Sequence, residues 1–305
     1  MGGSSYDRNV GTASRGKTYS RKAEEEYDKN TYADSAVLVS GDRRISTEVR
    51  HPIVIALDVT GSMGENTKIM FDKIPMFWGQ IEQKEFLSDP AISFAAIGDV
   101  YCDEAPTQIT PFEKGIKIDD WLKKIWLEGG GGGQAMESYD LIALFYTTRC
   151  SMPNAEHGFF FFIGDEGYYP KLDNQPTEPI FKALTEKFDT FFIHWPYQQD
   201  IIADRRIVSD WKKILGERLI ILKEPKAIVD VMLGLIAMRT GSMGLDHYAR
   251  DMKKRGQSDS RIETVIGAIE VVETEAIEIY QSKSPAKTIS GLLPNRDPFR
   301  QRKSW

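Results

Sequence analysis

The segment Asp58-Val59-Thr60-Gly61-Ser62 carries the residues best suited to chemistry in this sequence. It follows residues 53–57, an apolar, β-branched run typical of a strand buried on both faces of a parallel sheet. One carboxylate and two hydroxyls at alternate positions place three hard oxygen ligands on a single turn, which suits Mg²⁺. Transition metals prefer imidazole or thiolate, and this turn contains neither His nor Cys. The motif therefore predicts a Mg²⁺ site formed by Asp58, Thr60 and Ser62, with Mn²⁺ as the alternative ion.

Acidic residues also follow two later apolar runs. Asp165 comes after residues 159–163, the most hydrophobic run in the chain, and Asp99 comes after residues 92–98. Ligands of open α/β sheets bind outside the carboxyl ends of the strands, and a carboxylate buried there is costly unless it is paired or metal-bound. Asp165 is therefore predicted to complete the metal site. Asp99 is predicted to bind the metal or to support its ligands, and five glycines at 129–133 form a loop that enters a helix between these two strand ends.

Each of these features also has a purely structural interpretation. The Asp58 turn could be a strand-to-helix turn with hydroxyl caps, the turn at residues 165–167 could be simply polar, and Asp99 could cap a loop. The glycine run could be a flexible linker. It is not a P-loop, because no Lys-Ser or Lys-Thr pair follows it.

The elements that must position these residues alternate along the chain. Apolar runs predict strands at 53–57, 92–98, 108–112, 159–163, 190–195 and 218–222, with the third at an edge. Helical patterns predict helices at 67–83, 137–149, 178–188, 204–215 and 227–238. This order predicts an α/β fold, namely a doubly wound, mostly parallel six-stranded sheet.

The two ends of the chain differ from this central part. Residues 1–50 are polar and rich in Ser, Gly, Asp and Arg, which predicts an arm that is partly disordered or wraps the core. Residues 51–240 form the predicted α/β domain, and residues 241–305 form a C-terminal extension. Within the extension, an amphipathic helix is predicted at 261–280, either docked on the core or free for a partner. Residues 281–305 carry six Lys or Arg against one Asp and are predicted to form an extended basic tail.

The five residues Thr60 to Gly64 recur as Thr240-Gly241-Ser242-Met243-Gly244. The second copy follows a predicted buried helix and has Met238-Arg239 in place of Asp58-Val59. Gly241 is therefore predicted to end that helix, and the repeat to be a coincidence.

Composition limits the classes of function. The formal charge is −6 over 305 residues, which disfavours a protein that binds nucleic acid through bulk electrostatics. Two cysteines exclude a disulfide scaffold and a Cys-rich zinc site. No apolar run approaches the about 20 residues needed to span a bilayer, and residues 1–15 lack the apolar core of a signal peptide. The expected location is the cytoplasm, with neither nucleic acid nor membrane as a partner.

The Asp58 turn, the glycine run and Phe162-Ile163-Gly164-Asp165 together resemble the von Willebrand factor A domain. The turn is similar to the Asp-x-Ser-x-Ser signature of that family, with Thr60 at its middle hydroxyl. The similarity extends over residues 51 to about 240, and segment 131–138 looks like the glycine-rich loop of a bacterial, cytoplasmic branch of these domains.

This resemblance implies a six-stranded Rossmann-like fold with a metal-ion-dependent adhesion site. In the family, the counterparts of Asp58, Thr60 and Ser62 hold Mg²⁺, a later Asp matched here by Asp165 completes the shell, and an Asp or Glu of a partner protein takes an open position. The sequence departs from the family at the second loop, where a Thr ligand is common and the candidates here are Gln134, Glu137 and Ser138. An extra acid such as Glu137 would raise metal affinity and repel an incoming carboxylate.

The first functional hypothesis is a non-enzymatic, Mg²⁺-dependent protein-interaction module of a cytoplasmic multiprotein assembly, since the sequence shows no nucleophile and base arrangement. The resemblance adds an AAA-type ATPase as a partner. The alternative is a metal-dependent phosphohydrolase that uses Asp58 and Asp165. Against it, position 60 is Thr rather than a second Asp, and these loops lack a basic residue for phosphate. A third hypothesis makes residues 1–50 and 281–305 regulatory arms that cover the metal site.

Overall fold

The protein is described by a computed structural model, which places residues 33–127, 136–196, 201–279 and 298–299. Most of the predicted N-terminal arm and of the predicted basic tail lies outside these residues.

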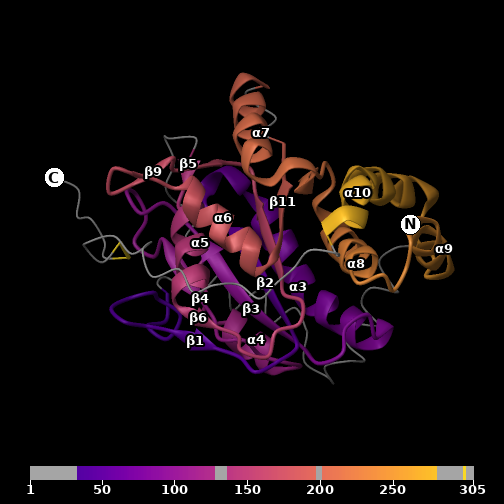
Figure 1. The fold of residues 1–305 in the computed structure, drawn as a ribbon, viewed down its shortest axis with the longest axis horizontal. Coiled ribbons are helices and arrows are strands. Elements are labelled where there is room, and N and C mark those ends of the chain that lie inside the picture. The colour runs from indigo at the N-terminus through magenta and orange to yellow at the C-terminus, as the bar shows by residue number, and fades with distance from the viewer. Residues whose placement is uncertain (1–32, 128–135, 197–200, 280–297, 300–305) are drawn as a thin grey trace.

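A six-stranded sheet forms the centre of the molecule (Figure 1). From one edge to the other, its strands are β12 (Leu219–Ile221), β11 (Asp189–His194), β7 (Phe159–Gly164), β2 (His51–Asp58), β3 (Pro90–Ile97) and β4 (Thr107–Ile109). All neighbouring pairs are parallel except β3 and β4, which are antiparallel. The predicted mostly parallel six-stranded sheet is therefore confirmed, and the segment predicted as an edge strand does lie at an edge.

Both faces of the sheet are covered by helices. Alternate side chains of β2 point to opposite faces, as the pleat of a strand requires. Ile53, Ile55 and Leu57 belong to one apolar core and Val54 and Ala56 to the other. The first core is closed by α3 (Glu65–Lys84), α4 (Lys117–Leu122) and α8 (Ile228–Arg239), and the second by α5 (Tyr139–Thr148), α6 (Glu178–Lys187) and α7 (Ile201–Leu215). Burial on both faces explains why these strands are almost uniformly apolar.

Shorter elements join this framework. Single 3₁₀ turns form at η1 (Gly61–Met63), η2 (Gly216–Arg218) and η3 (Pro225–Ala227). Three small two-stranded sheets pair β1 (Ile45–Ser46) with β6 (Cys150–Ser151), β5 (Met136–Glu137) with β8 (Gly167–Tyr168), and β9 (Lys171–Leu172) with β10 (Gln175–Pro176). In the described part of the chain, no helix is both long and apolar enough to cross a bilayer.

Two further helices, α9 (Leu245–Lys254) and α10 (Asp259–Ile279), extend the first core beyond α8 (Figure 1). The predicted amphipathic helix corresponds to α10, whose Val265 and Ile269 are buried against the core. The part of this helix that carries these two residues is therefore docked. Helix α9 was not predicted, although Leu245, Tyr248 and Met252 have helical spacing and the last two are buried.

The described part of the N-terminal arm wraps the core at the β4 edge of the sheet. Leu38 bridges Gln108 of β4 in antiparallel fashion, and the guanidinium of Arg43 donates hydrogen bonds to the carbonyls of Leu38 and Ile109. From the tail, the ring of Phe299 packs edge-on against Phe145 near the C-terminal end of α5. These segments occupy places other than the carboxyl end of β2, where the predicted metal site begins.

Candidate metal centre

The candidate site lies where β2 and β7 end, side by side, at the carboxyl edge of the sheet. The two strands are parallel neighbours, with Leu57 opposite Ile163. Asp58 is the last residue of β2, and Asp165 follows Gly164, the last residue of β7. The register of the two strands therefore places Asp58 and Asp165 at the same edge of the sheet. After Asp58 the chain turns through η1, which brings Thr60 and Ser62 into the same place. The structure thus brings together Asp58, Thr60, Ser62 and Asp165, as the sequence predicts.

Hydrogen bonds connect these four side chains in a row. The Thr60 hydroxyl donates to Asp58 Oδ1 at 2.5 Å, and the backbone N–H of Thr60 donates to the same oxygen at 2.9 Å. The Ser62 hydroxyl donates to Asp165 Oδ1 at 3.0 Å. Thr60 Oγ1 and Ser62 Oγ lie 3.2 Å apart.

The positions of the hydroxyl protons follow from this arrangement. A hydroxyl has one proton and two lone pairs. When Asp58 and Asp165 are both ionised, the Thr60 proton is directed to Asp58 and the Ser62 proton to Asp165, and Thr60 Oγ1 and Ser62 Oγ then turn lone pairs toward a common space. Such an arrangement suits a cation that accepts both lone pairs.

The oxygen spacing also fits Mg²⁺. Mg²⁺ takes octahedral oxygen ligands at about 2.0–2.1 Å, so neighbouring ligands are about 3 Å apart. The separations of 3.2 Å between the two hydroxyl oxygens and 3.0 Å between Ser62 Oγ and Asp165 Oδ1 match this value. The predicted ligands Thr60, Ser62 and Asp165 thus form the candidate donor set. Both oxygens of Asp58, the fourth predicted ligand, accept hydrogen bonds, which suits Asp58 to orienting the hydroxyl of Thr60. Within the described residues, no group of three or more His, Cys, Asp or Glu side chains is placed to hold a metal ion.

The electrostatics of the site favour a positive charge. Asp58 and Asp165 are both buried. Burial raises the pKa of Asp58, against hydrogen bonds from Thr60 and Tyr139 that lower it. Burial, followed by the charges of Asp58 and Glu166, raises the pKa of Asp165 to about 8. A bound divalent cation would offset this repulsion between buried acids.

Glu137 is the tentative candidate that faces this acidic region. It lies in β5 and is only 2% exposed, and its Oε2 has no hydrogen-bond partner among the residues that the structure describes. Burial, followed by the charges of Asp58 and Asp99, raises its pKa to about 11. Glu137 is thus a third buried acid, after Asp58 and Asp165, that a cation would stabilise.

The other tentative candidates have structural contacts or lie outside the described residues. Ser138 Oγ accepts a hydrogen bond from the Val100 N–H at 2.9 Å, which links two loops of the site. Asp99 Oδ1 accepts from the Tyr101 N–H and the Tyr169 hydroxyl, each at 2.9 Å, as expected for a residue that caps a loop. Gln134 is not among the described residues.

Two residues of the site were not singled out in the sequence. Tyr139, the first residue of α5, donates its hydroxyl to Asp58 Oδ2 at 2.9 Å. Gly164, the last residue of β7, leaves space for that hydroxyl. The only signal in the sequence is position: Tyr139 follows the candidates Glu137 and Ser138, and Gly164 precedes Asp165.

The second copy of the repeated motif lacks the carboxylates. Thr240 Oγ1 and Ser242 Oγ lie 2.7 Å apart, but the Thr240 hydroxyl contacts backbone carbonyls at the end of α8. Gly241 has a φ of +72° directly after the C-cap residue of that helix. The prediction that this copy ends a helix is confirmed.

Known proteins add little to this geometry. No family model matches the sequence, and no curated protein matches it. Among solved structures, two of the pilus adhesin SpaC from Lactobacillus rhamnosus GG are similar, each with a TM-score of 0.45 and with 9% and 7% identity. Each covers 65% of this chain, whereas the chain spans about a third of the adhesin, 32% and 31%. A likeness at this level carries no argument about the chain, whose function must be argued from its own residues.

Proposed function

We propose that residues 51–240 form a doubly wound domain of the von Willebrand factor A type, and that its carboxyl edge binds Mg²⁺, or Mn²⁺ in its place. Thr60, Ser62 and Asp165 would hold the ion, and Asp58 would orient the hydroxyl of Thr60. The observation that carries the proposal is the pair of hydroxyl oxygens 3.2 Å apart whose protons are both directed to carboxylates.

The bound ion would serve to bridge to another protein. Mg²⁺ usually retains several waters, and three protein ligands leave positions for an oxygen of a partner, such as an Asp or Glu side chain. Glu137 and Glu166 would oppose that carboxylate, and the ion would have to outweigh their repulsion. A role in a cytoplasmic multiprotein assembly, with an AAA-type ATPase as a partner, follows from the sequence resemblance alone.

The alternative, a phosphohydrolase, is less well supported by the geometry. A nucleophilic Asp needs a free carboxylate oxygen to attack phosphorus. Here Asp58 Oδ1 accepts two hydrogen bonds from Thr60, and Oδ2 accepts one from Tyr139. Hydrolysis of p-nitrophenyl phosphate that requires Mg²⁺ and is lost in Asp58→Asn would reverse this preference.

Calorimetric titration with Mg²⁺ and Mn²⁺ tests the proposal. Wild type should bind one ion, and Asp58→Asn and Ser62→Ala should each weaken binding at least about tenfold. Asp58→Asn would disorient the Thr60 hydroxyl, and Ser62→Ala would remove a ligand. Ser242→Ala is the matched control, since it removes the corresponding hydroxyl from the second copy of the motif. Absence of saturable binding by wild type, or equal losses in Ser62→Ala and Ser242→Ala, would refute the site.

A further inference from the structure

Tyr139 is buried directly beneath the candidate site. Its side chain is 0% exposed, and its hydroxyl donates to Asp58 Oδ2 at 2.9 Å. Burial, followed by the charges of Asp58 and Asp165, raises its pKa well above the usual value, so the hydroxyl keeps the proton that it donates. Asp58 is therefore held at both oxygens, by Thr60 on one side and by Tyr139 on the other.

Aromatic packing and the space over Gly164 fix the position of the Tyr139 ring. It packs edge-on against Phe162, Phe192 and Trp211, with ring centroids 5.7, 5.7 and 5.2 Å away. Its hydroxyl occupies the space over Gly164, where a Cβ would lie 1.8 Å from the hydroxyl oxygen and 2.9 Å from Asp58 Cβ. The hydroxyl thus reaches Asp58 only because residue 164 has no side chain.

We infer that Tyr139 is a positioning residue for the metal site: its hydroxyl fixes the carboxylate plane of Asp58 and, through Asp58, the hydroxyl of Thr60. This inference rests on the proposed function. The terminal torsion of an Asp side chain has a broad energy profile, so hydrogen bonds must set the direction of Oδ1. With Oδ2 held by Tyr139, Oδ1 faces Thr60 and accepts the hydrogen bond from its hydroxyl. The lone pairs of Thr60 Oγ1 are then directed toward the ion.

Tyr139→Phe is the variant that tests this inference, because it removes one oxygen and keeps the ring packing. Residues that orient metal ligands typically contribute 10–100-fold to metal affinity, so the variant should bind Mn²⁺ at least about tenfold more weakly than wild type. Tyr146→Phe is the matched control. Tyr146 is also on α5 and 0% exposed, but its hydroxyl pairs with Ser93 Oγ at 2.6 Å. Its Mn²⁺ affinity should stay within about twofold of wild type.

A double-mutant cycle separates positioning from a general loss of stability. In a Thr60→Ala background, Tyr139→Phe should have a smaller effect on Mn²⁺ affinity, because the hydroxyl that Asp58 orients is already gone. A purely structural role would give the same fold-change in both backgrounds. Circular dichroism of each variant checks that the fold is retained.

The outcomes distinguish this inference from the proposal on which it rests. If wild type binds Mn²⁺, Ser62→Ala loses affinity and Tyr139→Phe binds like wild type, the inference is wrong and the proposed site stands. If wild type does not bind Mn²⁺ at all, the proposed site fails and the inference fails with it. A tenfold loss in Tyr146→Phe as well would also overturn the inference, because any buried hydroxyl of α5 would then have the same effect.

Discussion

Thr60 and Ser62 differ from Thr240 and Ser242 in what accepts their protons. In the first pair the acceptors are Asp58 and Asp165, whereas Thr240 donates to the carbonyls of its own helix. The same residue types at the same spacing therefore make a candidate cation site in one copy and a helix end in the other. The carboxylates supplied by two neighbouring strands decide between these outcomes.

Gly164→Ala should disturb the site from the β7 side. The added methyl would overlap the Tyr139 hydroxyl and crowd Asp58, so we expect a loss of about 1–3 kcal/mol in the free energy of unfolding and loss of Mn²⁺ binding. Gly267→Ala is the control, because Gly267 is exposed in α10 with nothing within 4 Å of the added Cβ. It should stabilise the protein by about 0.5–1 kcal/mol. Urea unfolding measures both, and a neutral Gly164→Ala would contradict the close approach.

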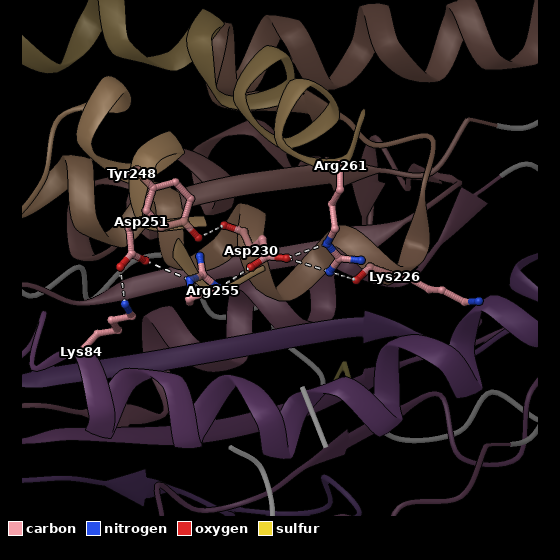
Figure 2. A network of polar contacts seen from close by, with 7 residues as sticks. All are labelled: Lys84, Lys226, Asp230, Tyr248, Asp251, Arg255 and Arg261. Atoms are coloured by element: carbon pink, nitrogen blue, oxygen red, sulfur yellow. Dashed lines mark hydrogen bonds and ion pairs between the residues drawn. The ribbon is translucent and has the colours of Figure 1, made fainter. Parts of the chain in front are cut away.

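At the scale of elements, buried and half-buried ion pairs join α8, α9 and α10 to one another and to α3 (Figure 2). Asp230 of α8 accepts hydrogen bonds from Arg255, which follows α9, and from Arg261 of α10, at 2.7–2.9 Å. Arg255 also donates to Asp251 at 2.9 Å, and Asp251 pairs with Lys84 of α3. The Tyr248 hydroxyl donates to the Asp230 carbonyl at 2.6 Å. Residues of the predicted extension are thus packed into the main core.

Asp230→Ala should weaken this assembly strongly. Among the described residues, it leaves Arg255, whose side chain is 5% exposed, with Asp251 as its acidic partner, and it leaves Arg261 with the more distant Glu224 at 3.9 Å. Removing one member of a buried pair typically destabilises a protein by about 3–5 kcal/mol, and because Asp251 remains we expect a value near the lower end.

The matched control is Lys253→Ala, which breaks an exposed pair with Asp259 in the same region. It should change the free energy of unfolding by less than about 0.5 kcal/mol. Urea unfolding monitored by circular dichroism compares the two variants. A similar small effect of both substitutions would mean that the network does not hold the C-terminal helices.

For the molecule as a whole, buried acids gathered at one end of the sheet make stability depend on pH. Burial is the main cause that raises the pKa of Asp140 and of Asp165 to about 8, from 3.8 in an unfolded chain. Between these values the folded state binds more protons than the unfolded state. The contribution of these groups is therefore fully present below about pH 4 and is lost as the pH rises toward 8.

Asp140→Asn isolates one of these contributions. The amide cannot ionise, so the variant should gain stability relative to wild type as the pH rises from about 4 to 8. Melting temperatures of both proteins across this range, with a chelator present, give the difference. The difference is the informative quantity, because His194, whose pKa is lowered mainly by burial, acts in the opposite direction within this range in both proteins. A difference that does not change with pH would show that Asp140 is ionised throughout.

The sequence by itself determined the sheet and the end of the sheet at which acids gather. Uniformly apolar strands such as 53–57 and 159–163 are recognisable because both of their faces are buried, and parallel strands place the residues after them at one edge. Asp58, Thr60, Ser62 and Asp165 can therefore be grouped from their positions in the chain alone, and their binding of a metal remains a prediction.

Only the tertiary structure decided which neighbours these residues have. The Tyr139 hydroxyl, the space over Gly164 and the loop contacts of Asp99 and Ser138 depend on how α5 and the loops pack against the strand ends. Contacts of this kind join residues far apart in the chain and leave no periodic pattern in it. The docking of α9 and α10 on α8 is of the same kind. The charged residues that form its ion pairs cannot be distinguished from surface charges in the sequence, because the pairing is formed only in the folded chain.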